Sequence, residues 1–231
     1  MDITASDVQI RASMGHIVAP GQLVEIRALQ VPTNVGPRTF SGFFDDIDKF
    51  SAAAAKLSNM GASGVYFTLN PLKASVTSQP RNLVTIATRG VLSKDVDVVH
   101  PKWLLIDIDP ERPSKESATD AEKAEAGQVA YAVLTFLGQQ GWPEPLLADS
   151  GNGYHLLYRL QKHAKVDSTA VRRCLTALAF MFDTDGAKID QKVYNPSRIC
   201  KIYGTIARKG ETSDTRPWRM ATLKPPKAFP K

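Results

Sequence analysis

The sequence predicts an α/β fold built from two modules, residues 1–100 and residues 101–222. Apolar runs of strand length alternate with longer stretches of helical periodicity along the 231 residues. The second half reads as strand, helix, strand, strand, helix, strand. Hydrophobic residues make up 43% of the chain, enough for a packed core. Residues 223–231 are rich in proline and lysine and are expected to be a tail or linker.

The amino-terminal module is expected to hold strands around one helix. Residues 23–29 alternate apolar and polar side chains, which is typical of a half-buried strand. Residues 43–60 are good helix formers with an alanine run and early acidic residues, and Gly61 ends this predicted helix. Residues 65–69 predict a second strand, and residues 83–88 are a candidate third.

The second module is more regular. Its expected elements are, in order, a strand at 103–109, a helix from Ser117 or Thr119 to about Gln140, strands at 146–148 and 154–160, a helix that starts at Asp167 or Ser168, and a strand within 198–207. This βαββαβ order is the arrangement of RRM-like and palm-like modules.

Two carboxylates, Asp107 and Asp109, end the strand at 103–109. Residues two apart on a strand point to the same face, so their charges repel unless a cation lies between them. Hard divalent ions such as Mg²⁺ and Mn²⁺ prefer carboxylate oxygens. The pair therefore predicts a metal site, although an acidic loop after a strand would show the same two residues.

A glycine-rich turn follows at residues 149–155, Asp-Ser-Gly-Asn-Gly-Tyr-His. Gly151 and the glycine after Asn152 allow backbone N–H groups to approach a ligand. Ser150 and Asn152 can donate hydrogen bonds, and His155 begins the next strand. Such groups beside a cation suit a triphosphate. The plain alternative is an Asn-Gly hairpin with a satisfied histidine.

A third acid, Asp190, precedes a basic segment that contains Arg198, Lys201, Arg208 and Lys209. Arginine and lysine neutralise phosphates, but they also protect the edges of sheets from aggregation. In a βαββαβ sheet the first and third strands are central neighbours, and the fourth strand lies beside the first. The acid pair, His155 and the segment around Asp190 are therefore expected to converge, as phosphoryl transfer by two metal ions requires.

These motifs in this order resemble the archaeo-eukaryotic primase superfamily, and especially bacterial and phage primase-polymerase domains, which are often fused to helicases. The matching stretches are Asp-Ile-Asp-Pro at 107–110, Ser-Gly-Asn-Gly-Tyr-His at 150–155, Ile-Asp at 189–190 and Asn-Pro-Ser-Arg-Ile-Cys-Lys-Ile-Tyr-Gly-Thr at 195–205. Residues 25–28 and 66–71 resemble the amino-terminal module of that subfamily. The resemblance therefore runs through most of the chain.

The resemblance implies a primase-type fold, with the amino-terminal α/β module packed on an RRM-like catalytic module. It implies two Mg²⁺ or Mn²⁺ ions and template-directed transfer of NTP or dNTP to a 3′-hydroxyl, with single-stranded DNA template and primer as partners and a helicase fused or associated. The residues implied are Asp107, Asp109 and Asp190 for catalysis and metal, Ser150, Gly151, Asn152, His155, Arg198 and Lys201 for the nucleotide, and Arg208 and Lys209 for nucleic acid.

Charge, cysteine spacing and hydrophobicity indicate the kind of partner, the absence of a zinc site and the cellular location. The formal net charge of +6 and a pI of about 9.3 suit a polyanionic partner. Neither Cys174 nor Cys200 has a Cys or His partner at zinc-ligand spacing, so no zinc site is expected. No signal peptide or membrane-spanning run is visible, which predicts a cytoplasmic protein without a membrane partner.

Two alternatives stay open at this point. A primer-dependent repair or end-joining polymerase of the same superfamily would extend strands without starting them. A catalytically inert RRM-like binder would instead need aromatic side chains exposed on its central strands, for which Tyr158 is the candidate.

Overall fold

The computed structural model describes residues 3–77, 80–88, 90–161 and 166–224, and these form two compact units. The first unit comprises residues up to His100 together with Pro196–Arg208 and Arg219–Thr222. The second comprises Pro101–Asn195, Lys209–Trp218 and the residues from Leu223 onward. The predicted module of residues 101–222 thus gives two segments to the first unit. Most of the expected tail, residues 225–231, lies outside the described residues.

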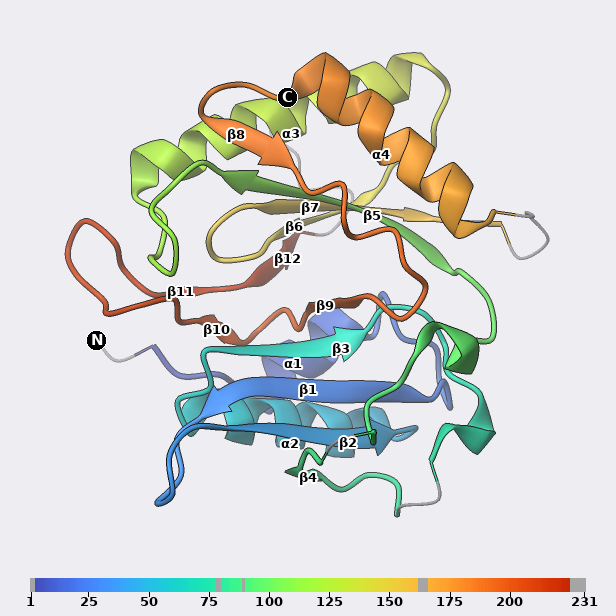
Figure 1. Cartoon of the computed structure of the whole chain (residues 1–231), viewed down its shortest axis with the longest axis vertical. Coiled ribbons are helices and arrows are strands. Elements are labelled where there is room, and N and C mark those ends of the chain that lie inside the picture. The colour runs from blue at the N-terminus through green and yellow to red at the C-terminus, as the bar shows by residue number, and fades with distance from the viewer. Residues whose placement is uncertain (1–2, 78–79, 89, 162–165, 225–231) are drawn as a thin grey trace. The chain divides into compact units, whose positions relative to one another are not determined.

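The first unit is a five-stranded sheet of order β4-β2-β1-β3-β9, with every neighbouring pair antiparallel (Figure 1). Its elements are α1 (Asp7–Met14), β1 (Val24–Val31), β2 (Arg38–Phe44), α2 (Ile47–Asn59), β3 (Gly64–Thr68), the 3₁₀ helices η1 (Ala74–Val76) and η2 (Asp95–Asp97), β4 (Thr85–Ile86) and β9 (Ile199–Lys201). A separate pair of short strands, β10 (Ile206–Ala207) and β11 (Arg219–Met220), completes it.

Helix α2 packs on this sheet through aromatic side chains. Phe50 of the helix meets Phe44 of β2 and Phe67 of β3 edge to face, at ring-centroid distances of 6.0 and 6.3 Å. The helix begins only at Ile47, because the Asp46 side chain accepts the first free backbone N–H groups as an N-cap. The predicted helix start at residue 43 was therefore wrong, and the aromatic end of β2 belongs to the sheet.

The second unit has the predicted βαββαβ order. Its elements are β5 (Trp103–Pro110), α3 (Asp120–Gln139), β6 (Leu146–Asp149), β7 (Tyr154–Arg159), α4 (Ser168–Phe182) and β8 (Ala187–Ile189), to which β12 (Thr222–Lys224) adds an edge. The sheet order is β12-β6-β7-β5-β8, so β5 and β7 are central neighbours and β8 flanks β5. This confirms the predicted positions of the first and third strands of the module.

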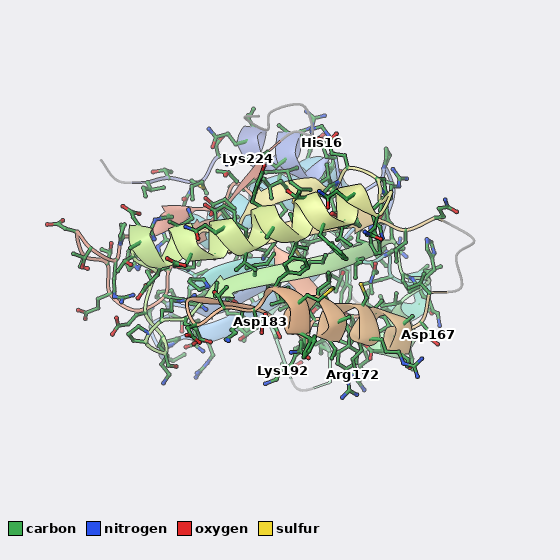
Figure 2. The ribbon with its side chains drawn as sticks, turned by 90° about the horizontal axis from the view of Figure 1, so that it is seen from above. His16, Asp167, Arg172, Asp183, Lys192 and Lys224 are labelled. Carbon is green, nitrogen blue, oxygen red and sulfur yellow. The ribbon has the colours of Figure 1, made fainter. Side chains whose placement is uncertain are left out.

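Helices α3 and α4 lie side by side on one face of this sheet, as Figure 2 shows. Phe136 of α3 and Phe182 of α4 pack ring against ring at 5.4 Å. Thr119 caps α3 through a capping box with Glu122, and Asp167 caps α4. No helix in the described ranges is both long and apolar enough to cross a membrane.

The last strand of the module differs from its prediction. The strand beside β5 is β8, and the predicted strand at 198–207 instead supplies β9, which pairs with β3 in the first unit. Residues 187–189 are too few to show a strand period, whereas the predicted strand rested on the longer run at 198–207, of which residues 199–201 form β9. Periodicity therefore found a strand but could not assign it to a sheet.

Candidate functional site

The acid pair lies on the face of the second sheet opposite α3. Ile108 pairs across the sheet with Tyr154, and the Lys123 ammonium of α3 lies 5.7 Å from the centroid of the Tyr154 ring. Because side chains alternate along a strand, Asp107 and Asp109 point to the other face. The helices bury the apolar side of β5 and leave its carboxylates on the helix-free side.

His155 lies directly beside the acid pair. It is the cross-strand partner of Asp107, and its Nε2 atom is 3.3 Å from the Asp107 carboxylate. The side chain is almost fully buried, with 4% of the residue exposed. The structure therefore brings together two of the groups that the sequence predicted to converge.

Asp190 follows β8 immediately. Its backbone N–H donates to the Asp107 carbonyl at 2.8 Å, so its main chain continues the ladder beside the acid pair. Its own carboxylate accepts from the Lys192 backbone N–H at 2.8 Å. In the described part of the chain, no three Asp, Glu, His or Cys side chains are close enough to hold a metal ion as they stand. The Asp190 backbone is thus hydrogen-bonded to Asp107, while the Asp190 side chain accepts the N–H of the residue two positions further on.

Electrostatics at the acid pair favour a cation. Burial, followed by the neighbouring Asp107 charge, raises the pKa of Asp109, and Arg112 and Lys209 oppose this shift. An Arg112 guanidinium N–H donates to Asp109 at 3.3 Å. Two same-facing carboxylates whose charges repel form an oxygen donor set that fits a hard divalent ion. The sequence reasoning missed Arg112, although its position three residues after Asp109 was a readable signal.

The glycine-rich turn is built by its own polar groups. The Ser150 N–H donates to the Gly153 carbonyl at 3.0 Å, and the Ser150 hydroxyl accepts the Gly153 N–H at 3.0 Å. A Cβ at Gly153 would collide with the Ile108 carbonyl, and Gly151 has φ of +97°. The Asn152 side chain accepts the Ala118 N–H at 2.8 Å. The turn therefore packs on β5 next to the acid pair, and the Asn152 carbonyl is used to hold it there.

Three of the basic residues belong to the first unit. The Lys201 ammonium is buried, donates to the Ile206 carbonyl at 3.0 Å and lies 5.2 Å from the centroid of the Tyr66 ring. Arg208 donates to the Ser58 carbonyl at 2.7 Å. Arg198 precedes β9, and its carbonyl accepts the Leu69 N–H. The contacts of Lys201 and Arg208 stabilise this unit, and only Lys209 of the basic set falls in the second unit.

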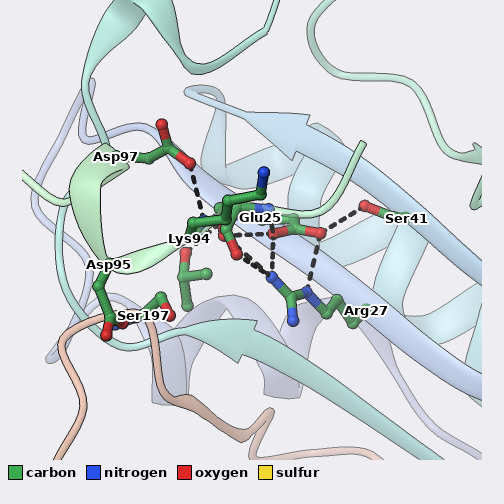
Figure 3. Close-up of polar contacts among 9 residues, drawn as sticks. Glu25, Arg27, Ser41, Lys94, Asp95, Asp97 and Ser197 are labelled. Carbon is green, nitrogen blue, oxygen red and sulfur yellow. Dashed lines mark hydrogen bonds and ion pairs between the residues drawn. The ribbon is translucent and has the colours of Figure 1, made fainter. Parts of the chain in front are cut away.

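The first unit also contains a buried charge cluster that no sequence pattern indicated (Figure 3). Glu25 of β1 is fully buried and binds Arg27 through two hydrogen bonds of 2.9 and 2.8 Å. Its carboxylate also accepts from the Ser41 hydroxyl at 2.7 Å and from the Ser93 N–H and hydroxyl at 3.0 and 2.5 Å. Both carboxylate oxygens of Glu25 are thus paired.

The segment after Ser93 is tied to the start of β9. The Asp95 carboxylate accepts from the Ser197 N–H and hydroxyl at 2.9 and 2.6 Å, next to Arg198. The Asn70 side chain donates to the Pro196 carbonyl at 2.9 Å. These bonds fix the backbone immediately before Arg198, the residue to which the resemblance assigns a nucleotide contact.

Comparison with known proteins shows a similarity of fold and no similarity of sequence to a known family. No protein-family profile and no curated protein matches the sequence. Among solved structures, the chain is similar to primase RepB′, with a TM-score of 0.50 and 12% sequence identity over 95% of this chain and 56% of that chain. The chain thus spans little more than half the length of that primase. At this identity the likeness concerns the fold, and we conclude that the chain has a primase-like fold.

Proposed function

We propose that the chain is a metal-dependent DNA primase-polymerase. It would transfer nucleotides from NTP or dNTP to a 3′-hydroxyl on a single-stranded DNA template and release pyrophosphate. The observation that carries this proposal is the placement of Asp107, Asp109 and His155 on adjacent central strands, with the Asp190 backbone bonded to Asp107. The likeness to primase RepB′ supports it at the level of fold.

The chemistry follows from the donor set. Two Mg²⁺ or Mn²⁺ ions, held by Asp107, Asp109 and Asp190, would lower the pKa of the attacking hydroxyl and neutralise the triphosphate. For this, the Asp190 side chain must turn towards the acid pair, since only its Oδ1 is used by the Lys192 N–H and the described acids are not gathered closely enough as they stand. His155, oriented by Asp107, donates to a phosphate oxygen. The Ser150 hydroxyl accepts a hydrogen bond from the Gly153 N–H and can donate a hydrogen bond to the nucleotide.

The inert RRM-like alternative loses its stacking residue. Tyr158 is only 2% exposed and packs edge to face against Trp142 at 5.2 Å. It shares a face of β7 with Tyr154, the side that meets α3, and so lies opposite the acid pair. An aromatic platform for bases would need the reverse arrangement.

The decisive test is strand synthesis by the Asp107→Asn, Asp109→Asn double variant. We expect incorporation to be nearly abolished with the fold intact, because the variant keeps the shape of both side chains and removes both charges. Asp45→Asn, Asp48→Asn is a matched control with two carboxylates changed in the first unit. Near-normal synthesis by the Asp107/Asp109 variant would refute the proposal.

The assay uses single-stranded DNA, with and without primer, labelled NTP or dNTP, and Mg²⁺ or Mn²⁺. Products from unprimed DNA identify an initiating enzyme. Products from primed DNA alone identify the primer-dependent polymerase that the sequence left open.

A further inference from the structure

The loop at residues 209–218 of the second unit is fastened by one arginine. Both terminal nitrogens of Arg216 donate to the Glu122 carboxylate, at 2.8 and 2.7 Å. The Arg216 Nε lies 3.0 Å from the Glu116 carboxylate. Glu122 is already fixed, because it closes the capping box of α3 with Thr119. A two-pronged contact between a guanidinium and a carboxylate defines orientation as well as distance. The far end of the loop is thereby anchored to the start of a helix.

The near end of the loop is anchored to the same place. The Ser117 hydroxyl donates to the Lys209 carbonyl at 3.0 Å, and the Ser117 carbonyl accepts from Arg216 at 2.7 Å. Ser117 is buried, and the next residue, Ala118, donates its N–H to Asn152 of the glycine-rich turn. Both ends of the loop and the glycine-rich turn therefore meet on residues 117–118.

This arrangement brings a cation to the acid pair. The Arg112 guanidinium donates to Asp109 at 3.3 Å, and Ser117, five residues further on, holds the Lys209 carbonyl. Partial burial and then Arg112 lower the pKa of Lys209, and the charges of Asp109 and Asp107 oppose this shift. Arg112 is itself held by the Glu116 carbonyl at 3.0 Å, within the same anchoring segment. Arg112 thus contacts the acid pair directly, and the Lys209 charge acts on it from a backbone position that Ser117 holds.

We propose that Arg216 and Glu122 are positioning residues whose ion pair, together with Ser117, fixes Lys209 beside the acid pair as a cation for the phosphates of the bound nucleotide. This inference rests on the proposed function and gives Lys209 a different role from the nucleic-acid contact expected of a loop lysine. A backbone-binding lysine gains from mobility, since phosphates pass it in many registers. A lysine whose loop is fastened at both ends instead suits one phosphate position.

The test compares Lys209→Ala, Arg216→Gln and the double variant. Affinity is measured for an α,β-imido deoxynucleotide, which binds without being incorporated, and amide hydrogen exchange reports the 209–218 loop. We expect Lys209→Ala to weaken nucleotide binding about 10- to 100-fold, the loss of one charge-assisted hydrogen bond. Arg216→Gln should speed exchange in the loop and weaken binding similarly. The double variant should be no weaker than Lys209→Ala alone, because both changes remove the same contact.

Arg81→Gln is the matched control, since it breaks an arginine–carboxylate pair with Asp45 in the first unit. It should leave nucleotide affinity unchanged. DNA affinity against salt completes the set, and its slope should stay unchanged in Lys209→Ala.

Each contrary result has one meaning. Faster loop exchange in Arg216→Gln with unchanged nucleotide affinity would overturn the inference alone, as would fully additive losses in the double variant. A salt slope lowered by about one unit in Lys209→Ala, with normal nucleotide affinity, would make Lys209 a backbone contact instead. Wild-type protein that binds no nucleotide would refute the proposed function and this inference together.

Discussion

Replacing Glu25 by alanine tests whether the buried charge cluster holds the first unit together. The substitution removes all five acceptor contacts of the carboxylate, two of them with Arg27 and two with Ser93. Arg27, whose side chain is 15% exposed, keeps a hydrogen bond to the Ser93 carbonyl but loses its counter-charge. Removing one partner of a buried ion pair costs about 3–5 kcal/mol.

That cost converts into a thermal shift. For a chain of 231 residues, 1 kcal/mol moves the unfolding midpoint by roughly 2–4 °C, so Glu25→Ala should lower Tm by roughly 6–20 °C. Differential scanning calorimetry measures the shift, with the unfolding of the two units resolved where they separate. Asp45→Asn is the control, because its ion pair with Arg81 is partly exposed and should be worth under about 1 kcal/mol.

Two outcomes would refute this reasoning. A Tm within about 2 °C of wild type for Glu25→Ala would mean that the cluster contributes little net stability. Equal shifts for Glu25→Ala and Asp45→Asn would mean that burial of the pair is irrelevant. A Glu25→Gln, Arg27→Met variant should recover part of the loss, since a neutral replacement leaves no buried unpaired charge.

Three further predictions follow from local geometry. Gly153→Ala should destabilise the second unit and reduce nucleotide incorporation, because a Cβ there collides with the Ile108 carbonyl. The control Gly138→Ala, in open space on α3, should raise the free energy of unfolding in denaturant by about 0.5–1 kcal/mol. Equal effects of the two substitutions would contradict the close approach at Gly153. Tyr158→Phe should be neutral or stabilise the fold by up to about 1 kcal/mol, since the buried Tyr158 hydroxyl has no hydrogen-bond partner in the described chain. Burial also raises the pKa of Tyr158 to about 12. A clear decrease in Tm for Tyr158→Phe would reveal a partner of the hydroxyl. The folded state raises the pKa of Asp109, so its charge costs stability at a pH above the ordinary value of 3.8. Asp109→Asn should therefore be more stable than wild type at pH 7 and lose that advantage as the pH falls towards 4, and a constant difference across pH would contradict the sign. If the proposed metal site is correct, Mn²⁺ should raise the Tm of wild type and not that of Asp109→Asn.

The sequence predicted most of the fold where periodicity was long. The strands at 103–109 and 154–160, and the helix capped at Thr119, were found within a residue or two of their observed bounds. The elements it missed were short or ambiguous, such as α1 and β8, or were masked by neighbours, as β2 was by the alanine-rich helix after it. Short elements are selected by tertiary pairing, which local pattern does not contain.

For the site, spacing predicted that Asp107 and His155 would meet, because strand order and alternation are enough to pair them. The sequence could not separate Lys209 from Lys201 and Arg208, which are close in number but differ in surroundings. Lys201 and Arg208 donate to backbone carbonyls of the first unit, whereas Lys209 interacts electrostatically with Asp109 and Asp107 of the second unit. The charge pattern of the sequence shows that basic side chains are present. Only the folded structure shows which of them already donate hydrogen bonds to the protein's own backbone.

The interleaved composition of the two units bears on how the protein is made. Strand β3 has β1 on one side and receives β9 on the other, from residues that the ribosome adds about 130 positions later. Until then the nascent chain presents an open strand edge, which can pair with any other exposed strand. Neither unit can therefore be excised as a continuous fragment. The first unit must stay incomplete during translation while the whole of Pro101–Asn195 is synthesised.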